Sequence, residues 1–370
     1  MKISREHLVQ TEDYMIDTIR DSVNSRLTGY NFGLLPPCKG ETLSGDFEIT
    51  ERISNCVEIE LRRCNAITSG GCRIDINPNN HRNYLKLDYL FDEKDSKSNN
   101  KDEWDVILIV HPFGRVPTGT PDPDETPPRH PFADRAYTLS IKPIGQINVE
   151  ELGMHHLIIG RIIKKGEMYE VDKTYIPPCM TMLSHPDLKT YYERFGKYLN
   201  DIEVASQKII QKILENDRSI TIAKNTQLLC EHVLGYIVSV YFKYRNMGRN
   251  YAPIEIADIF SSFAHMCFVS LNFIPKKQRE EMLQYFYEWS DVTPGNFVEI
   301  LTEMLEVVYD HHNIRLIMEK TEYFLSVFSA LWIKLSTLEY IGQHKENIVV
   351  SEKIQKQETG ARKTGWTIID

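Results

Sequence analysis

The chain changes its pattern of apolar residues at one short segment, Tyr175-Ile-Pro-Pro-Cys-Met180. Before this segment apolar residues mostly alternate in short runs, as in strands, and after it they recur every three or four residues, as in helices. The chain has 370 residues, more than one hydrophobic core usually organises. The sequence therefore predicts two domains of different class that meet at this segment.

We predict an α+β multidomain protein with three parts. An N-terminal domain, residues 1–178, is expected to be an antiparallel β-sandwich with an opening helix, and residues 179–342 are expected to form an α-helical bundle. The remaining residues, 343–370, lack periodicity and are predicted to be a flexible tail. The opening helix is placed at Arg5–Thr28, because Leu8, Met15, Ile19, Val23 and Leu27 share one face and Gly29 can end it.

The sandwich prediction depends on eight short runs with strand-like patterns. Two long polar insertions, Asp92–Glu103 and the proline-rich Val116–Pro131, interrupt them, and such insertions are either binding loops or plain surface. The runs are Asp46–Thr50, Cys56–Leu61, Cys72–Ile76, Tyr84–Phe91, Trp104–His111, Tyr137–Ile141, His156–Ile163 and Met168–Val171.

The helical prediction begins at Asp187, where apolar residues continue at helical spacing for about eight turns. Pro253, Pro275 and Pro294 are well placed to start helices. The further helices are expected at Gln227–Asn246, Pro253–Phe273, Pro275–Trp289, Pro294–His311 and Leu316–Ile341.

Charge and composition disfavour several classes of protein. The net charge is -9, and acidic residues outnumber basic ones on both sides of Met180, whereas nucleic-acid binders usually need a Lys/Arg surplus. The N-terminus has no apolar stretch typical of a signal peptide, and no window has eighteen uninterrupted apolar residues. Seven cysteines without a CxxC pair indicate a reducing compartment. A cytoplasmic protein without a nucleic-acid partner is expected.

The motifs of common catalytic and cofactor sites are not found. The sequence contains neither GxxxxGK[ST] nor GxGxxG, and it contains neither GxSxG nor HExxH. The pairs His155-His156 and His311-His312 and the regularly spaced Cys56, Cys64 and Cys72 do not complete a metal-ligand set. We expect no enzyme, cofactor, metal or small-molecule substrate. The alternative is a hydrolase or small-ligand-binding protein with a pocket between the domains, in which His156 or His311 is a general base.

Three stretches resemble the TssK family of type VI secretion baseplate subunits. The first runs from His7-Leu-Val-Gln-Thr-Glu-Asp-Tyr14 into Gly29-Tyr-Asn-Phe-Gly-Leu-Leu35, and the second is Tyr175-Ile-Pro-Pro-Cys179, which is similar to a junction ahead of the family's long helix. The third is the helix start at Pro253-Ile-Glu-Ile-Ala-Asp-Ile-Phe260. Their order and spacing cover most of the chain up to Ile341.

The resemblance implies a fold, a role and partners. The sandwich is expected to be like the shoulder of phage receptor-binding proteins, and the chain is expected to assemble as a homotrimer that serves as a non-enzymatic adaptor in a contractile injection machine. The implied partners are wedge proteins (TssF, TssG and TssE-like) and a protein of the membrane complex, at the inner face of the cytoplasmic membrane. The family usually carries a third, C-terminal domain, whereas here 29 residues follow Ile341. We therefore expect a short variant in which the tail with Trp366, or another subunit, substitutes for it.

An adaptor of this kind needs apolar surface for its partners, because obligate interfaces usually bury more than about 2,000 Å². The alternative for each candidate residue is that it fills the core of its own domain. The candidate interface residues are Leu8, Met15 and Ile19 of the opening helix, Tyr30, Phe32, Leu34 and Leu35 just after it, and Trp366 of the tail.

Overall fold

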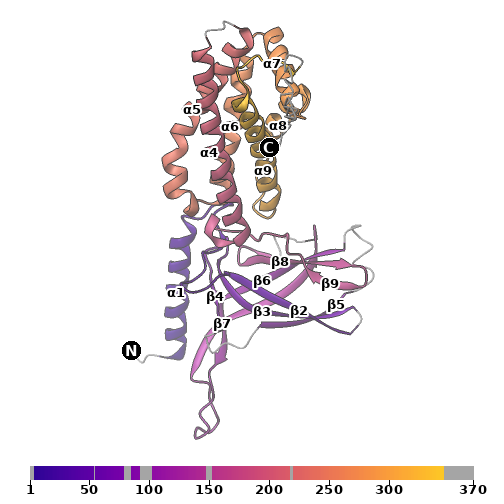
Figure 1. The fold of residues 1–370 in the computed structure, drawn as a ribbon. Helices are drawn as coiled ribbons and strands as arrows, with labels where there is room; N and C mark the ends of the chain where they lie inside the picture. Colours follow the sequence, from indigo (N-terminus) through magenta and orange to yellow (C-terminus); the bar gives the residue numbers. More distant parts are fainter. Residues whose placement is uncertain are drawn as a thin grey trace, which may run out of the picture.

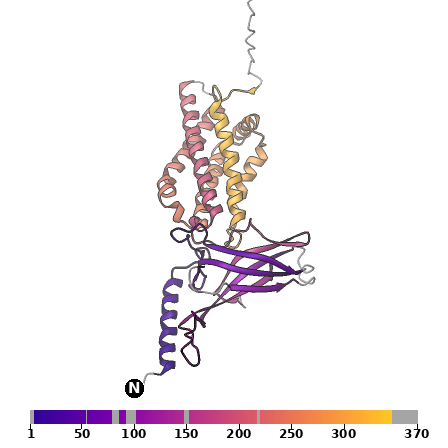
Figure 2. The ribbon, with the colours of Figure 1, turned by 60° about the horizontal axis from the view of Figure 1, so that its bottom comes forward.

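The structure is a computed structural model that describes residues 4–53, 55–78, 85–91, 102–146, 152–216 and 220–345. Figure 1 shows a β-sandwich with a bundle of helices standing on one end of it. The N-terminal helix lies outside both, beside the sandwich and below the bundle. The view in Figure 2, turned by 60°, shows the same separation of the sandwich from the bundle.

The sandwich consists of two antiparallel sheets. In the first, the long strand β3 pairs with each of the other four strands, and in the second the order is β7-β6-β8-β9. The first sheet contains β1 (Gly33–Leu34), β2 (Gly45–Ile53), β3 (Cys56–Ile67), β4 (Arg73–Ile76) and β5 (Leu85–Leu90). The second contains β6 (Glu103–Thr118), β7 (Phe132–Pro143), β8 (His156–Lys165) and β9 (Met168–Val171).

Aromatic side chains join the two sheets at the core of the sandwich. The ring of Phe91, just after β5, stacks on the ring of Tyr169 from β9 with centroids 3.9 Å apart, and the ring of Trp104 from β6 meets Phe91 edge-on at 4.6 Å. Such aromatic pairs add about 0.5–1.5 kcal/mol each beyond the burial of their area. The alternating pattern along the strands places these side chains inward because successive residues point to opposite faces.

Helix α1 (Arg5–Asn24) is attached to the sandwich by few contacts. Ser4 caps it by accepting a hydrogen bond from the backbone N–H of His7. Its side chain Glu12 forms an ion pair with Arg115 of β6 at 2.8 Å, and none of its twenty residues is buried. A helix normally depends on burying its apolar face, so α1 is unusual in its exposure.

The bundle is built on two long helices, α4 and α5, with α9 packed on the other side of α4. Prolines stand in the first turn of α4, α6 and α8, where the missing N–H costs nothing. The helices are α4 (Pro186–Glu215), α5 (Thr221–Met247), α6 (Pro253–Asn272), α7 (Lys276–Trp289), α8 (Pro294–Leu305) and α9 (Ile314–Thr337), with short 3-10 turns η1 (Met182–Ser184) and η2 (Gly248–Asn250).

A cluster of buried aromatic rings fills the bundle. Phe263 of α6 contacts the rings of Phe324 and Phe328 of α9, and Phe328 stacks on Trp332 with centroids 4.0 Å apart. Within the described ranges, α6 is the one helix long and apolar enough to cross a membrane by length and composition, and 50% of its most apolar window is buried inside the chain. A core helix of a bundle has the same properties, and α6 contacts α5, α8 and α9.

The predicted fold class is confirmed: an antiparallel β-sandwich comes first and a helical bundle follows. Three elements differ from the prediction most clearly. The strands β6 and β7 continue beyond the sandwich into the proline-rich insertion, and α8 ends at Leu305, before the expected His311. The predicted boundary between residues 178 and 179 falls in the segment between β9 and η1, and the limits of the domains remain a prediction.

Candidate assembly surfaces

The segment that connects the sandwich to the bundle makes a buried, strand-like contact with β1. The backbone N–H of Leu34 donates to the carbonyl of Pro178 at 2.7 Å, and the N–H of Met180 donates back to the carbonyl of Leu34 at 2.9 Å. Gly33 makes this approach possible, because its φ is +105° and a Cβ there would lie 2.0 Å from the Pro178 oxygen. The junction segment that the sequence singled out is thus tied to the sandwich by backbone hydrogen bonds.

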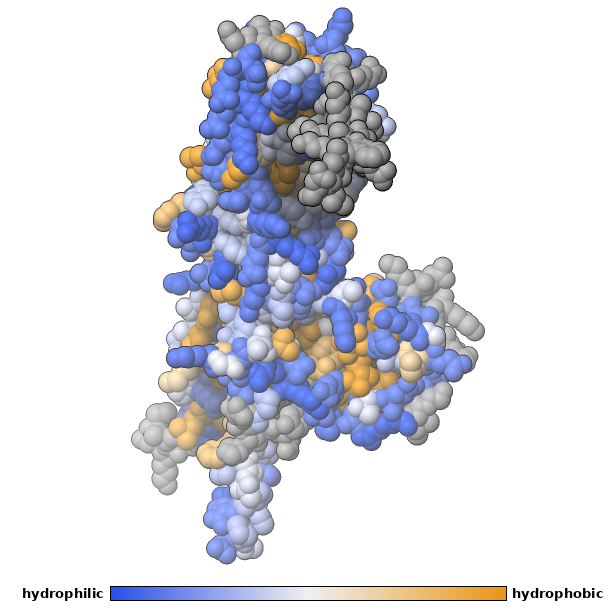
Figure 3. Space-filling model, in the orientation of Figure 1, coloured by the Kyte–Doolittle hydropathy of each residue, from blue (hydrophilic) through white to orange (hydrophobic). Residues whose placement is uncertain are grey.

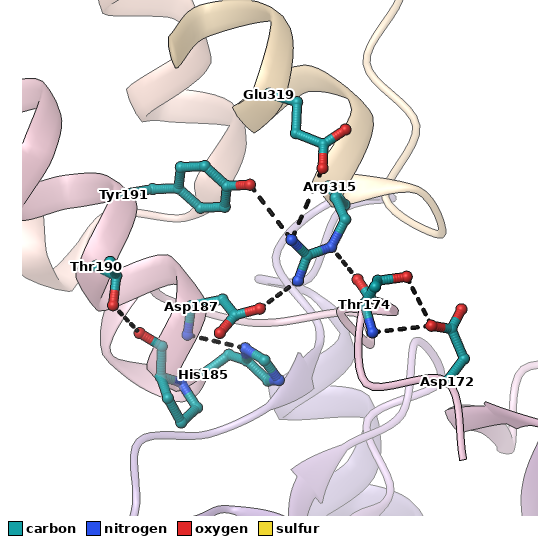
Figure 4. Close-up of polar contacts among 9 residues, drawn as sticks. Asp172, Thr174, His185, Asp187, Thr190, Tyr191, Arg315 and Glu319 are labelled. Carbon is teal, nitrogen blue, oxygen red and sulfur yellow. Dashed lines mark hydrogen bonds and ion pairs between the residues drawn. The ribbon is translucent and has the colours of Figure 1, made fainter. Parts of the chain in front are cut away.

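Arg315, near the start of α9, links three segments at the junction (Figure 4). Its guanidinium donates to the backbone carbonyl of Thr174, to the carboxylate of Asp187 at the start of α4, and to the hydroxyl of Tyr191 at 3.3 Å. The carboxylate of Glu319, one turn further along α9, lies 3.8 Å away. One planar side chain with several donors therefore holds the sandwich linker, α4 and α9 in a fixed arrangement.

His311, in the loop before α9, ties that loop to the segment after α1. Its Nε2 donates to the carbonyl of Phe32 at 3.0 Å, and its Nδ1 accepts from the hydroxyl of Tyr309 at 2.8 Å. Burial disfavours the charged imidazolium and lowers the pKa of His311 to about 4. The imidazole is therefore neutral at pH 7 and serves as a structural link.

A charged pair on the second sheet contains the buried Asp105 of β6, whose carboxylate accepts from Nε of Arg161 at 3.1 Å. Burial raises the pKa of Asp105, although the Arg161 guanidinium acts in the opposite direction. The same guanidinium lies 4.6 Å from the ring centroid of Tyr175. These groups are held by one another, which favours a structural role.

The alternative of catalysis at the junction finds little support in this geometry. His156 uses Nδ1 for the carbonyl of Gly153 at 2.7 Å, and both ring nitrogens of His311 have partners. The cavity between Arg161, Tyr175 and the start of α9 has a volume of about 160 Å³, below the roughly 300 Å³ of typical ligand pockets, and neither histidine lines it. In the part of the chain that the structure describes, no three His, Cys, Asp or Glu side chains gather as a metal site would require.

Two of the three regularly spaced cysteines, Cys64 and Cys72, are buried. Cys64 of β3 points into the core, and its burial raises the pKa of the thiol to about 12. Burial also raises the pKa of the Cys72 thiol, which lies 3.4 Å from Nδ1 of His155. A thiol with a raised pKa stays protonated at pH 7 and is a poor nucleophile or metal ligand.

The apolar face of α1 lies in solvent. Leu8 is 64% exposed, Met15 is 57% exposed and Ile19 is 66% exposed. The helix turns a different side, which includes Ile16, Arg20 and Val23, toward the sandwich, so Val23 does not share the exposed face as predicted. Burying a large apolar side chain stabilises a protein by roughly 1.5–3 kcal/mol, so these three residues form a surface that gains from a partner.

The other predicted interface residues are divided between surface and core. Tyr30 is exposed and Leu35 is half-buried, whereas Phe32 and Leu34 are buried in the core of their own chain. Phe32 and Leu34 fill the core of their own chain, which was the alternative to the interface prediction. Leu34 lies in β1, which pairs with β3, and Phe32 packs against His311. Trp366 lies outside the described residues.

The sequence did not predict the arm formed by the ends of β6 and β7. Beyond His111 the two strands continue as a ribbon, with Arg115–Thr118 paired to Phe132–Arg135, and this ribbon projects below the sandwich (Figure 1). Phe113, Val116 and Phe132 on it are exposed. A groove of about 600 Å³ lies beside the ribbon, and residues that line it include Ile76, Leu85, Val116, His130, Phe132 and Tyr137. Because the ribbon has no buried face, its sequence carries no alternating pattern that could have predicted it.

A second exposed apolar surface, on the last three turns of α5, was also not predicted. Val238 is 73% exposed and Phe242 is 68% exposed, and Tyr241 lies beside them. Figure 3 shows apolar surface over α5 and, further down the same side, over α1. The sequence analysis placed the run Val238-Ser-Val-Tyr-Phe242 in a helix, but a stripe at helical spacing does not reveal whether it faces the core or a partner.

Comparisons with known proteins identify the fold. No protein-family model matches the chain, and no curated protein matches it. A structure of TssK from the type VI secretion system of EAEC, solved with a nanobody, is similar with a TM-score of 0.50 and 12% identity, over 87% of this chain and 98% of that one. A crystal structure of TssK has a TM-score of 0.51 and 16% identity, over 89% of this chain and 70% of that one. A TssK–TssF–TssG baseplate subcomplex gives a TM-score of 0.48 at 11% identity, over 89% of this chain and 96% of that one. The chain has a TssK-like fold, as the sequence resemblance predicted.

Proposed function

We propose that this chain is a structural subunit of a type VI secretion baseplate and that it acts through protein contacts. The TssK-like fold supports this role. The observation that carries the proposal is the exposed apolar surface of α1, α5 and the β6–β7 arm on that fold, because large apolar patches on a soluble surface mark interaction sites. The finer proposal is a cytoplasmic, non-enzymatic homotrimer that links wedge proteins to the membrane complex.

The rigid junction fits the work of an adaptor. An adaptor transmits position between partners, and the contacts of Arg315, His311 and Gly33 fix the sandwich relative to the bundle. The sandwich, with its arm, is the proposed contact for the wedge proteins TssF, TssG and a TssE-like subunit. The bundle, with the tail that contains Trp366, is the proposed contact for the membrane complex.

Co-purification with the wedge proteins tests this function directly. The full-length chain, tagged and expressed in its own cell, should retain wedge proteins of the same secretion system. Replacing Val116 and Phe132 of the arm with Asp should weaken that retention, whereas replacing Tyr323, an exposed aromatic residue of α9, should leave it unchanged. A chain that retains none of them under conditions where the secretion system assembles would contradict the proposal.

Self-assembly is tested separately by the mass of the particle. Light scattering of the purified chain should give the mass of three copies of 43.1 kDa. A monomer that persists at micromolar concentrations would contradict the trimer, and it would leave the wedge contact to be judged by co-purification.

A further inference from the structure

Two helices on one side of the molecule present apolar faces to solvent. We define the α1 face as Leu8, Met15 and Ile19, and the α5 face as Val238, Tyr241 and Phe242, all exposed. Both faces have the spacing of a helix stripe that packs on another helix, because their members are three, four or seven residues apart.

The α5 face lies on the end of a helix that buries few residues against its own chain. From Val238 to Met247, Tyr244 is the one residue that is buried, and its ring stacks on Tyr192 of α4. A cleft of about 480 Å³ lies between this end of α5 and α4, lined among others by Leu199, Tyr241 and Arg245. The α5 face therefore offers a partner helix both exposed apolar side chains and an adjoining concave surface.

The α1 face and the α5 face do not cover each other within one chain. Figure 1 shows α1 beside the sandwich and, above it on the same side of the molecule, the end of α5 at the outer side of the bundle. Figure 2 shows the same order after a turn of 60°. Because the residues of both faces are exposed, each face is open to another molecule.

Charge decides which faces can pair. Helix α1, Arg5–Asn24, carries five acidic and two basic side chains, a net charge of -3. Residues 236–250, the end of α5 with η2, carry Lys243, Arg245 and Arg249 and no acidic residue, a net charge of +3. Pairing of α1 with α1, or of α5 with α5, would bring like charges within the Debye length of about 8 Å. Pairing of α1 with α5 brings opposite charges together.

We infer that the α1 face of one copy packs against the α5 face of a second copy of this chain. The contact combines two apolar helix stripes with opposite net charges, so that one copy supplies an acidic helix and the other a basic one. A contact between two different surfaces can close into a ring of few copies. This inference rests on one part of the proposed function, the self-assembly of the chain, and it names the contact through which the copies assemble.

Single apolar-to-acidic substitutions test the contact in the full-length chain. Met15→Asp on α1 and Phe242→Asp on α5 should each raise the dissociation constant of the assembly at least tenfold, as measured by analytical ultracentrifugation over a range of concentrations. Both residues are exposed, so the variants should keep the far-UV circular dichroism of the parent chain. Tyr323→Asp, at an exposed aromatic residue of α9, is the matched control and should not change the dissociation constant.

A charge exchange tests the pairing itself. Lys243→Glu with Arg245→Glu should weaken association, and Glu6→Lys with Asp21→Lys on α1 should also weaken it. The four substitutions together should restore association to within a few fold of the parent chain, because the signs are exchanged and the pairing is kept. A structural defect in either helix would not be rescued by the other pair.

The outcomes separate this inference from the proposed function. If the parent chain assembles and the α1 and α5 variants assemble equally well, the inference is wrong and the proposed self-assembly stands. If the variants weaken assembly but the charge exchange does not rescue it, the pairing of α1 with α5 is also wrong. If the parent chain stays monomeric, both the inference and the proposed trimer are wrong, and retention of wedge proteins still decides the baseplate role.

Discussion

Tyr192 of α4 and Tyr244 of α5 hold their helices together through reciprocal hydrogen bonds. The hydroxyl of each tyrosine donates to the backbone carbonyl of the other, and the two rings stack with centroids 4.6 Å apart. Gly196 makes room for this pair, because a Cβ there would lie 3.3 Å from the ring of Tyr244. The pair anchors the end of α5 whose outer side presents the α5 face.

Removal of one hydroxyl should loosen this anchor. Tyr244→Phe keeps the ring and its stacking but loses the donated hydrogen bond, and we expect the free energy of unfolding to fall by about 1 kcal/mol. Urea denaturation followed by circular dichroism measures the change. Tyr323→Phe, at an exposed tyrosine of α9, is the control and should change stability by less than about 0.5 kcal/mol. Equal stability of Tyr244→Phe and the parent chain would show that the hydrogen bond is not formed in solution.

Replacement of Gly33 should lower the stability of the folded chain far more than the loss of the Tyr244 hydroxyl. Gly33→Ala would place a methyl group against the Pro178 carbonyl in a backbone conformation with φ of +105°, so the junction would have to open. Strain and lost contacts of this kind cost about 3 kcal/mol or more. Gly235→Ala in α5 is the matched control, because no atom lies within 4 Å of its Cβ position and alanine favours a helix by roughly 1 kcal/mol. Thermal unfolding should show a large loss for the first variant and a small gain for the second.

Loss of Arg315 should loosen the junction without unfolding the domains. Arg315→Ala removes donors to Thr174, Asp187 and Tyr191, and we expect a loss of about 1–3 kcal/mol together with faster limited proteolysis between β9 and α4. Arg194→Ala is the control: its ion pair with Glu322 also joins α4 to α9, but its side chain is 55% exposed. Exposed pairs contribute less than about 1 kcal/mol, so this variant should resist proteolysis like the parent chain. Similar cleavage of both variants would argue against a special role for Arg315.

Stability should fall as the pH is lowered from 7 toward 4. The pKa of His311 is about 4 in the folded chain against 6.5 for the free side chain, so between these values the unfolded chain binds more protons. Its contribution is present above pH 6.5 and is lost as the pH falls toward 4, by about 2 kcal/mol between pH 7 and pH 5. Burial lowers the pKa of His185 and His312 as well, which acts in the same direction, whereas the raised pKa of Asp105 acts in the opposite direction.

The contribution of His311 can be isolated by substitution. His311→Asn retains a donor and an acceptor but does not titrate, so its free energy of unfolding should depend less steeply on pH between 4 and 6.5. Urea denaturation of both chains at several pH values measures the two slopes. Identical slopes would show that His311 is not held neutral in the folded chain.

Periodicity was enough to predict the fold class and most elements. The strand Met168–Val171 and the start of the opening helix at Arg5 coincide with the observed bounds, since alternation and helical spacing follow directly from burial of one face. Periodicity failed where an element extends beyond its core, as in the β6–β7 arm, because an exposed ribbon has no buried face to leave a pattern. Periodicity also predicted that α8 is more than one turn longer than it is, so that the predicted helix ran into the loop that carries His311.

The sequence by itself determined that the chain has a β-rich domain, a helical domain and a junction at Tyr175–Met180, because these are local properties of hydrophobic spacing. Only the tertiary structure decided which apolar residues are buried in the core and which are exposed to solvent. Phe32 is buried because it packs against His311, and Leu34 is buried because β1 pairs with β3. Met15 and Phe242 stay in solvent because other faces of their helices pack against the chain. A stripe of apolar residues predicts that a helix will bury one face, but the identity of the surface that covers it depends on contacts between residues far apart in the sequence.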